Sequence, residues 1–405
     1  MPDALLINIF PFFLFISLAK HLLGVYYSST CNKKGVITVP HCKNIEKPCF
    51  DKNASRALKG IAILLMMLHH NFRSVELFGQ YSVSFFPFRE QQVVNLALSC
   101  KICVSLFAFI SGYGLFLSYQ NSKINASSWT AKRYIRTFSG YWFVWIASSI
   151  ISQIIDGRAT RILCSGNMSQ SIAYTFIDFL GLHNLFNTPS VNGTWWYMSA
   201  AAVFILLTPV LYKYRNNLWL ILFMPCVCIR IIHSSGTSAF TGGNSVYAFL
   251  SPFILGAIFA NYHYFEKWSS IGSSRISTKI YKCIAEIYVL ILLYKMYHGL
   301  PQPVFWEFHF GIYPTVFILF CVEFIIPIAF IKKILEFLGK HSMNVFLVHT
   351  FIRGYYLADF TYSWKHFIII CLVLLIISIA ISVVIEKAKT VLHYDKLINK
   401  LVSLF

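Results

Sequence analysis

Long apolar runs recur along the whole chain, and they constrain its fold more than any other feature. Examples are FILLTPVLY at residues 204–212 and FIIICLVLLIISIAISVVI at residues 367–385. Inside a bilayer every backbone N–H and C=O group must be bonded internally, which leaves only helices and closed barrels. Barrel strands alternate apolar and polar residues, whereas these runs are continuously apolar. The sequence therefore predicts an all-α membrane protein that crosses the bilayer several times.

The composition excludes the common soluble classes. Charged residues make up 12% of the 405 residues and the mean hydropathy is +0.63, whereas soluble domains carry roughly 25% charged residues. A soluble enzyme, a secreted disulfide-stapled domain and a disordered scaffold are therefore excluded. We expect about eleven spans from the apolar run lengths. They lie near residues 4–26, 57–74, 92–118, 137–155, 194–212, 218–233, 245–261, 282–298, 308–330, 342–358 and 366–386.

The formal net charge of +19 reflects topology rather than nucleic-acid binding. Cytoplasmic loops accumulate Lys and Arg, and 24 of the 34 basic residues fall on one set of alternate loops and span ends. The opposite set holds only a few, such as Arg73, Arg89 and Arg158. We therefore expect an external N-terminus, a cytoplasmic C-terminus, the lipid bilayer as a partner and no nucleic acid.

The loops divide the chain into four parts. A transmembrane helix over residues 1–27, which lacks the basic start and cleavage site of a signal peptide, precedes a polar cytoplasmic linker over residues 28–55. Residues 56–388 form one membrane domain of ten helices, and residues 389–405 form a cytoplasmic tail. The longest external connection, residues 156–193, contains the half-apolar stretch SIAYTFIDFLGLHNLF. Such a stretch is too short and broken for a span and fits a re-entrant or interfacial segment capping an external cavity.

The eleven cysteines show no metal-ligand spacing. Most of them stand inside spans or on the cytoplasmic side, where a thiol is an ordinary small apolar side chain. We expect no metal.

His69 and His70 stand near the end of the apolar helix RALKGIAILLMMLHHNF. His70 follows Lys59 by eleven residues, which places it about 16 Å into a hydrocarbon core about 30 Å thick. Ionisable groups at this depth cost about 2.5–3.5 kcal/mol and are functional candidates by default. A histidine there can act as a neutral base. The alternative is a structural histidine hydrogen-bonded between helices.

Arg133 and Arg136 form a pair just before a helix that we expect to begin near Thr137. Residues three apart share a helix face, so the two guanidinium groups are placed to bind phosphate together. On spacing alone, plain anchoring at the cytoplasmic surface is the favoured interpretation.

Three further segments carry candidate site residues. Ser111 stands beside Gly112 in a helix where small residues permit close helix packing, which is the favoured interpretation. Trp195, Trp196 and Tyr197 stand at the outer end of a span and fit either an interfacial belt or a stacking platform for a sugar. A late helix buries a second histidine, His349.

Other ionisable residues within spans are weaker candidates, because most of them can pair or extend to the membrane surface. They are Lys101, Glu286, Lys295, Glu323 and Arg353.

Taken in order along residues 52–388, these pieces resemble the acyltransferase-3 family of integral membrane acyltransferases. Six motifs in order carry the resemblance, although each motif alone is weak. They are Lys59-Gly60…His70, Leu106-Phe107…Ser111-Gly112-Tyr113, Arg133-x-x-Arg136, Trp196-Tyr197-Met198-Ser199, Pro252-Phe253-Ile254-Leu255-Gly256 and Gly339-Lys340-His341-Ser342…Phe346-Leu347-Val348-His349.

The chain departs from the family pattern in three places. Lys59 stands where the family usually has arginine, and Arg56 lies one turn earlier, so either cation is a candidate for that role. His69 adjoins His70 and is a second candidate for the catalytic role. The N-terminal helix lies outside the resemblance, so the fold expected is a ten-helix acyltransferase-like core plus one extra span.

The resemblance implies an enzyme of the bacterial cytoplasmic membrane that moves an acyl group, usually acetyl, from cytoplasmic acetyl-CoA to a hydroxyl of a cell-surface or lipid-linked glycan. Lys59, Arg133, Arg136 and Arg56 would bind the CoA phosphates. His70, with His69 as second candidate, would deprotonate the acceptor or carry the acyl group transiently.

Acceptor binding would fall to Trp195, Trp196, Tyr197, Ser111 and His349. The alternative function is a non-catalytic carrier or flippase for a glycan or lipid-linked precursor. Such carriers often show inverted repeats, and this sequence shows none.

Overall fold

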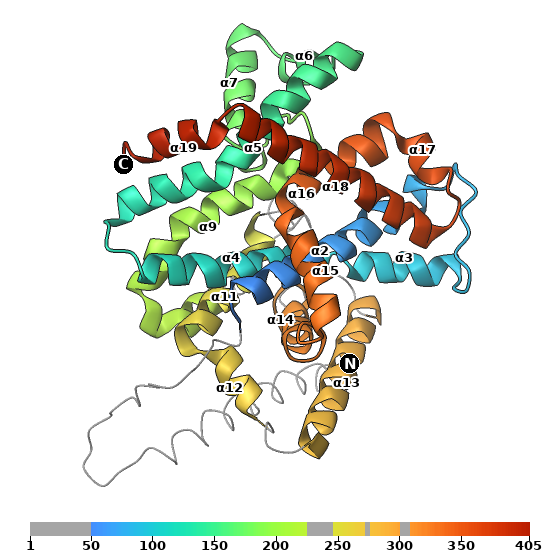
Figure 1. Cartoon of the computed structure of the whole chain (residues 1–405), viewed down its shortest axis with the longest axis vertical. Helices are drawn as coiled ribbons and strands as arrows, with labels where there is room; N and C mark the ends of the chain where they lie inside the picture. The colour runs from blue at the N-terminus through green and yellow to red at the C-terminus, as the bar shows by residue number, and fades with distance from the viewer. Residues whose placement is uncertain (1–49, 225–245, 272–275, 300–307) are drawn as a thin grey trace, which may run out of the picture. The chain divides into compact units, whose positions relative to one another are not determined.

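The computed structural model describes residues 50–224, 246–271, 276–299 and 308–405. In these ranges the regular secondary structure is helical, apart from an isolated bridge between Ser84 and His366 (Figure 1). The prediction of an all-α protein is therefore confirmed for the part of the chain that the structure describes. The N-terminal helix expected over residues 1–27 and the linker up to residue 49 lie outside that part.

The α-helices that position the site come from all parts of the described chain. In chain order they are α2 (Lys52–Phe72), α3 (Glu90–Ser99), α4 (Ile102–Gln120), α5 (Ala126–Asp156), α6 (Arg158–Leu163), α7 (Met168–Phe179), α8 (His183–Phe186), α9 (Trp196–Lys213), α11 (Leu250–Tyr262), α12 (Tyr264–Ser270), α13 (Ile276–Gly299), α14 (Tyr313–Phe320), α15 (Ala329–Lys340), α16 (Ser342–Thr350), α17 (Ala358–Tyr362), α18 (Phe367–Val391) and α19 (Tyr394–Val402). Wider π-helical turns occupy Phe308–Ile312, Cys321–Ile325 and Phe351–Tyr356.

Four helical stretches of the described residues are long and apolar enough to cross a membrane: Glu90–Gln120, Ala126–Asp156, Gly193–Lys213 and Phe367–Val391. A fifth span is possible if Val246–Tyr262 and Tyr264–Ser270, which meet at 69°, count as one broken span. The expected total of about eleven is not confirmed.

Several expected spans differ from the helices in ways that explain the lower number. The span expected at 57–74 is α2, whose first turns carry Lys52, Arg56 and Lys59. The span expected at 342–358 is the nine-residue α16 followed by a π-helical segment. Part of the span expected at 218–233 lies outside the described residues.

The long external connection expected at 156–193 folds into three short helices, α6, α7 and α8. At the other end of the chain, the expected tail over residues 389–405 contains the last residues of α18 and the amphipathic α19.

Glycines allow two helix pairs to approach until their backbones touch. A Cβ atom at Gly112 of α4 would overlap the Phe253 carbonyl of α11, and one at Gly256 of α11 would overlap the Phe109 carbonyl of α4. The same reciprocal arrangement joins α2 and α15, where Gly60 faces Leu335 and Gly339 faces the backbone of Arg56. Small residues at such positions are the usual means of close helix packing in membranes.

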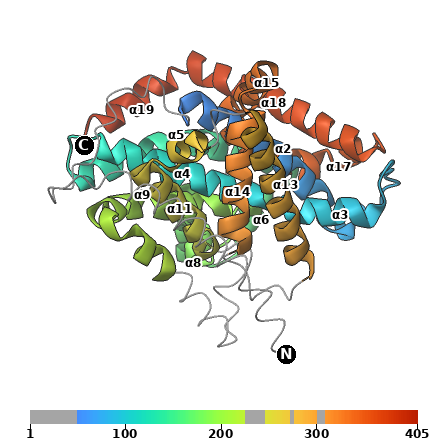
Figure 2. The ribbon, with the colours of Figure 1, turned by 90° about the horizontal axis from the view of Figure 1, so that it is seen from below.

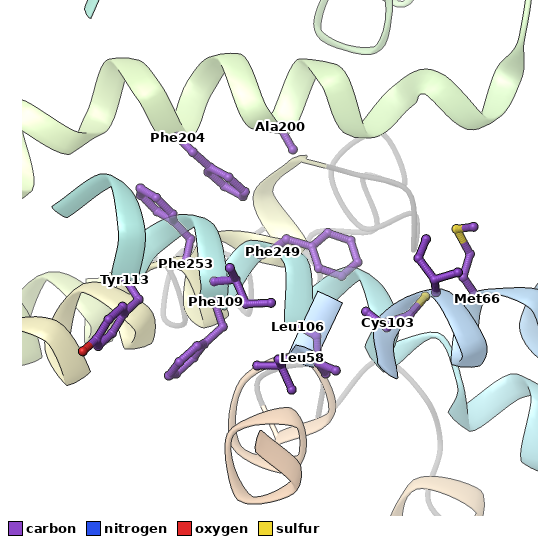
Figure 3. Close-up of a cluster of buried hydrophobic side chains, with 14 of the residues drawn as sticks. Leu58, Met66, Cys103, Leu106, Phe109, Tyr113, Ala200, Phe204, Phe249 and Phe253 are labelled. Carbon is purple, nitrogen blue, oxygen red and sulfur yellow. The ribbon is translucent and has the colours of Figure 1, made fainter. Parts of the chain in front are cut away.

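Aromatic side chains fill the space beside the α4–α11 contact (Figure 3). Phe204 of α9 stacks on Phe253 of α11, with ring centroids 4.3 Å apart and planes 5° from parallel. Phe109 of α4 meets Phe259 edge to face at 5.1 Å. Contacts of this kind fix α9, α4 and α11 as one packed unit.

Helix α2 packs against this unit through α4, and it also contacts α3, α15, α16 and α18. Figures 1 and 2 show it passing between α4 and α15, while α13 and α14 lie side by side at one flank. Asp51 caps the start of α2 by accepting a hydrogen bond from the Ala54 backbone N–H at 2.7 Å. Because α2 is held on several sides, the residues at its two ends keep a fixed separation.

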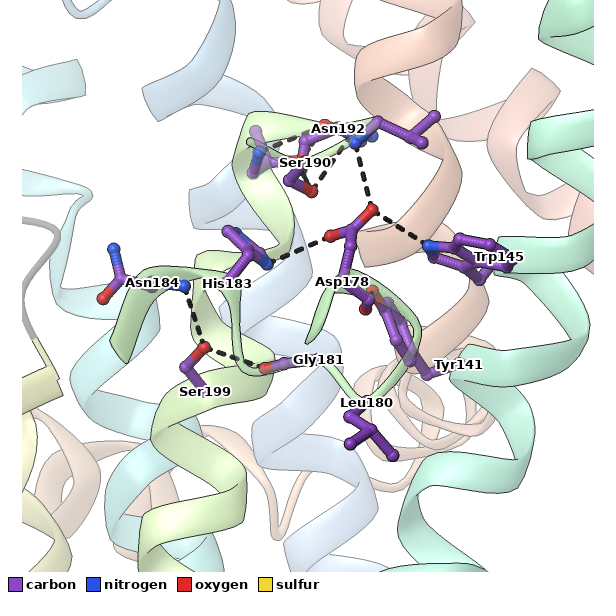
Figure 4. Close-up of polar contacts among 12 residues, drawn as sticks. Tyr141, Trp145, Asp178, Leu180, Gly181, His183, Asn184, Ser190, Asn192 and Ser199 are labelled. Atoms are coloured by element: carbon purple, nitrogen blue, oxygen red, sulfur yellow. Dashed lines mark hydrogen bonds and ion pairs between the residues drawn. The ribbon is translucent and has the colours of Figure 1, made fainter. Parts of the chain in front are cut away.

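A buried carboxylate organises the connection between α7 and α9 (Figure 4). Asp178 is fully buried, and its Oδ2 accepts hydrogen bonds from Trp145 Nε1 at 2.9 Å and from the Val191 backbone N–H at 3.1 Å. Its Oδ1 lies 3.3 Å from His183 Nδ1. The Tyr141 hydroxyl donates to the Asp178 carbonyl at 2.6 Å. These contacts tie the connection to α5 just before the chain reaches Gly193 and Thr194.

We predict that Gly112→Ala destabilises the protein while Gly114→Ala, two residues further along α4, does not. A Cβ at Gly112 overlaps backbone atoms, whereas one at Gly114 meets nothing within 4 Å among the described residues. Overpacking of this kind typically costs about 1–3 kcal/mol. Thermal unfolding in detergent measures the difference, and equal melting temperatures for the two variants would contradict the α4–α11 contact.

We also predict that Asp178→Asn lowers the thermal stability. Asparagine keeps only one acceptor oxygen, so its NH₂ meets either the two donors at the Oδ2 position or His183 at the Oδ1 position. Leaving a buried donor unsatisfied costs about 1–3 kcal/mol. Asp395→Asn, at an exposed residue of the first turn of α19, is the control. A melting temperature for Asp178→Asn no lower than that of the control would show that the network contributes little.

Candidate functional site

A cavity of about 440 Å³ lies at the C-terminal end of α2. Residues from four regions line it: the end of α2 and the following turn, the start of α4, the turn before α9, and the segment from Thr350 to Tyr362. His69 and His70 both line this cavity. Sequence spacing did not predict that the turn before α9 and the segment from Thr350 to Tyr362 would lie beside these two histidines.

His70 meets the second predicted histidine, His349, across the helix interface. Their ring centroids are 4.7 Å apart and the planes are tilted by 51°. Nδ1 of His70 is buried and has no hydrogen-bond partner among the described residues. His70 therefore lines the cavity with a ring whose Nδ1 is not held by a protein hydrogen bond among the described residues.

His69 and His70 differ in their hydrogen bonding although they are neighbours. The Nδ1 of His69 lies 2.8 Å from the Ala97 carbonyl oxygen of α3, so this nitrogen donates and the ring is held against α3. The side chain of His69 is almost fully buried, at 5% exposure. This contact makes His69 the histidine hydrogen-bonded between helices, whereas the Nδ1 of His70 has no such partner among the described residues.

A chain of polar contacts continues from His349 to the turn before α9. Nδ1 of His349 donates to the Phe346 carbonyl at 2.8 Å, which leaves Nε2 as the acceptor of the neutral ring, 3.2 Å from the Thr350 hydroxyl. Thr350 lies 3.1 Å from the Thr194 hydroxyl, which donates to Asn192 Oδ1 at 2.8 Å. Thr194 and Thr350 line the cavity, so this chain forms part of its polar wall.

The residues predicted to bind the acyl acceptor divide into those that line the cavity and those that do not. Trp196 lines the cavity, whereas Trp195 is fully buried and donates its Nε1 hydrogen to the Leu347 carbonyl at 3.0 Å. Tyr197 packs against Phe107, Phe204 and Phe346.

Neither Tyr197 nor Ser111 is among the described residues that line the cavity. Ser111 lies next to Gly112 in α4 and is half-buried. Their roles, like that of His349, stay predictions.

A cationic cluster lies at the opposite end of α2 from the cavity, and we name it by its four members: Arg56, Lys59, Arg133 and Arg136. The first two belong to the first turns of α2 and the last two to α5. Lys59 lies close enough to Arg133 and Arg56 for their positive charges to act on it, and Arg136 acts in the same way on Arg133.

No member of the cationic cluster forms an ion pair within the described ranges. The Nε atom of Arg133 is buried and likewise has no hydrogen-bond partner there. Arg56 is exposed and Lys59 half-buried. Cations gathered without carboxylates fit a ligand that carries several negative charges.

The start of α5 differs from the prediction. The helix begins at Ala126, capped by Asn125 through a 2.8 Å hydrogen bond to the Ser128 backbone N–H, and not near Thr137. Arg133 and Arg136 therefore lie within α5 rather than before it. The spacing argument is unaffected, because residues three apart share one face anywhere in a helix.

Two of the five weaker in-span candidates, Glu323 and Glu286, have polar partners, and Lys295 is exposed. Glu323 forms an ion pair with Lys282 at 2.6 Å, and Glu286 accepts a hydrogen bond from Trp268 Nε1 at 2.8 Å. Arg353 and Lys101 instead line the cavity.

Sequence reasoning missed Asp178, Thr194 and Thr350. The one available signal was the acidic residue in the otherwise apolar SIAYTFIDFLGLHNLF, since a lone carboxylate in such surroundings needs buried donors.

A family model described as an acyltransferase domain, that of acyltransferase family 3, matches residues 53–387. No curated protein and no solved structure matches the chain. The matched residues make up most of the chain and include the cationic cluster, both cavity histidines and His349. The chain therefore belongs to the acyltransferase-3 family, as a multi-pass membrane acyltransferase.

Proposed function

We propose that the protein moves an acyl group, acetyl in the first instance, from acyl-CoA to a hydroxyl of a cell-surface or lipid-linked carbohydrate. The observation that carries this proposal is the placement of two complementary sites at the two ends of α2. One end holds the unpaired cationic cluster, and the other holds His70 in a cavity.

The separation of the two sites fits the shape of acyl-CoA. Eleven residues separate Lys59 from His70, a rise of about 16 Å in a helix. In acyl-CoA the thioester lies at the end of a long pantetheine arm, far from the phosphates. Arg56, Lys59, Arg133 and Arg136 would bind the phosphates on the cytoplasmic side, while the arm would lead the thioester towards His70.

His70 would act as the general base. Its neutral ring takes the proton of the acceptor hydroxyl, and the hydroxyl oxygen attacks the thioester carbonyl. The C–S bond breaks as the new C–O bond forms, and the departing CoA sulfur takes up the proton. The products are the acylated carbohydrate and free CoA, so that no further reactant is needed.

The proposed location is the bacterial cytoplasmic membrane, with the cavity on the external side and the cationic cluster and the C-terminus on the cytoplasmic side. The cavity-lining segments come from the loops that carry few lysines and arginines in the topology derived from the sequence. The acceptor carbohydrate would therefore reach the cavity from outside or from the outer leaflet.

We predict that His70→Asn lowers acyl transfer by about 10²–10⁴, because asparagine cannot accept the hydroxyl proton. The measurement uses the full chain in liposomes with radiolabelled acetyl-CoA and a crude glycolipid extract, and it counts label in the glycan fraction. His393→Asn, at an exposed residue with left-handed backbone, is the matched control and should stay near wild type.

Thermal unfolding of both histidine variants separates loss of chemistry from loss of fold. Transfer by folded His70→Asn at the wild-type rate would remove His70 from the mechanism. Label that never leaves CoA with the folded wild-type protein would favour the carrier function instead.

We further predict that Arg133→Gln raises the KM for acetyl-CoA while kcat changes little. Losing a charge-assisted hydrogen bond costs about 1.5–3 kcal/mol, which corresponds to roughly 10–100-fold. Lys123→Gln, at an exposed residue before α5, is the control. If Arg133→Gln lowers kcat and leaves KM unchanged, Arg133 does not bind the donor.

A further inference from the structure

Three cations converge on the cavity that contains His70. Arg73 comes from the end of α2, Lys101 from the start of α4 and Arg353 from the π-helical segment after α16. Glu76 is the single acidic residue among the described residues that line this cavity, and its side chain is exposed. Basic side chains therefore outnumber acidic ones among the described residues that line the cavity.

Arg353 is the most informative of the three because it is buried. Its exposure is 9%, and its Nε atom is buried without a hydrogen-bond partner within the described ranges. The guanidinium lies beside the Tyr362 hydroxyl, a neutral group that cannot balance its charge. A buried cation without a counter-charge is costly and marks a functional position in a membrane protein.

Arg73 lies close enough to Arg353 for the two positive charges to repel each other. In the part of the chain that the structure describes, neither forms an ion pair with a carboxylate. By contrast, the Lys282 ammonium is paired with Glu323. Two arginines held together without an acid leave their charge to be balanced by a bound anion.

Aromatic rings beside these cations provide surfaces for a sugar. Tyr81 stacks on Tyr362 with centroids 4.6 Å apart and planes 10° from parallel, and Trp196 lines the same cavity. The nearby Asp359 accepts a hydrogen bond from the Tyr81 hydroxyl at 2.7 Å and is not among the cavity-lining residues. Aromatic faces next to arginines suit a ring that carries an anionic substituent.

We propose that the acyl acceptor is an acidic carbohydrate whose carboxylate or phosphate binds Arg73 and Arg353 while its hydroxyl faces His70. This proposal rests on the proposed acyl transfer and names the chemical class of its acceptor. A carboxylate on the sugar ring and a phosphate ester present the same oxygens to a guanidinium fork, so separate probes distinguish them.

The test is equilibrium dialysis of the full chain in nanodiscs against labelled trisaccharides in two matched pairs. Trigalacturonate is compared with its neutral methyl ester, and maltotriose phosphate with maltotriose. We expect one charged member to bind about tenfold or more tightly than its neutral partner. The pair that shows the preference identifies the anion.

Variants assign the preference to the two arginines. Arg73→Gln and Arg353→Gln should each reduce it and the double variant should abolish it, whereas Arg353→Lys, which keeps the charge, should retain part of it. Arg161→Gln is the matched control, because Arg161 is exposed and paired with Asp156 at 3.1 Å. Thermal unfolding verifies that each variant is folded.

Three results would overturn the proposal. The first is the absence of a charged-over-neutral preference in both pairs, including failure of all four probes to bind. The second is a preference that survives in the folded double variant. The third is competition between free CoA and the charged trisaccharide, which would assign these cations to the donor.

These outcomes are independent of the acyl-transfer assay. Failure of transfer with intact, arginine-dependent binding would leave the acidic-sugar site and overturn the enzymatic function alone. Transfer that depends on His70 without any charge preference would overturn only the acceptor class.

Discussion

Direct backbone contact between helices is the constraint on which the rest of the structure depends. In each of two pairs, α4 with α11 and α2 with α15, a glycine of one helix lies against a carbonyl of the other, and the relation is reciprocal. Two contacts per pair fix both the distance and the rotation of the helices. Since α2 and α4 also touch each other, the two pairs form one rigid group. The cavity and the cationic cluster are both attached to it.

The sequence predicted the helical class and singled out Lys59 and His70 of α2 as candidates, because a histidine eleven residues from a lysine in an apolar helix has few structural explanations. It predicted the Arg133–Arg136 pair for a similar reason, since helical geometry alone places them on one face. It did not distinguish Trp195 from Trp196. Neighbours on a helix point about 100° apart, and only the packing of α16 decides which ring meets the cavity.

The span number and the cavity wall were beyond sequence reasoning for a different reason. Hydropathy counts apolar residues, but α2 carries charged residues in its first turns and α16 has only nine residues. Both helices pack among other helices, so their environment is not set by hydropathy alone. Contacts such as Thr194 with Thr350 join residues far apart in the chain, and no local pattern marks a threonine that completes a distant wall. The acidic residue Asp178 gave a local signal, yet its four partners come from α5, α8 and the following connection.

The rigid support of α2 has a consequence for the choice of acyl donor. Because the helix is held along its length, the distance between the cationic cluster and His70 cannot shrink to suit a smaller molecule. In the proposed function the donor must therefore span a fixed length. A donor whose acyl carbon lies next to its phosphate, such as an acyl phosphate, would reach either the cationic cluster or His70 but not both. Discrimination among activated acyl compounds would then depend on molecular length, set by the number of helical turns between Lys59 and His70.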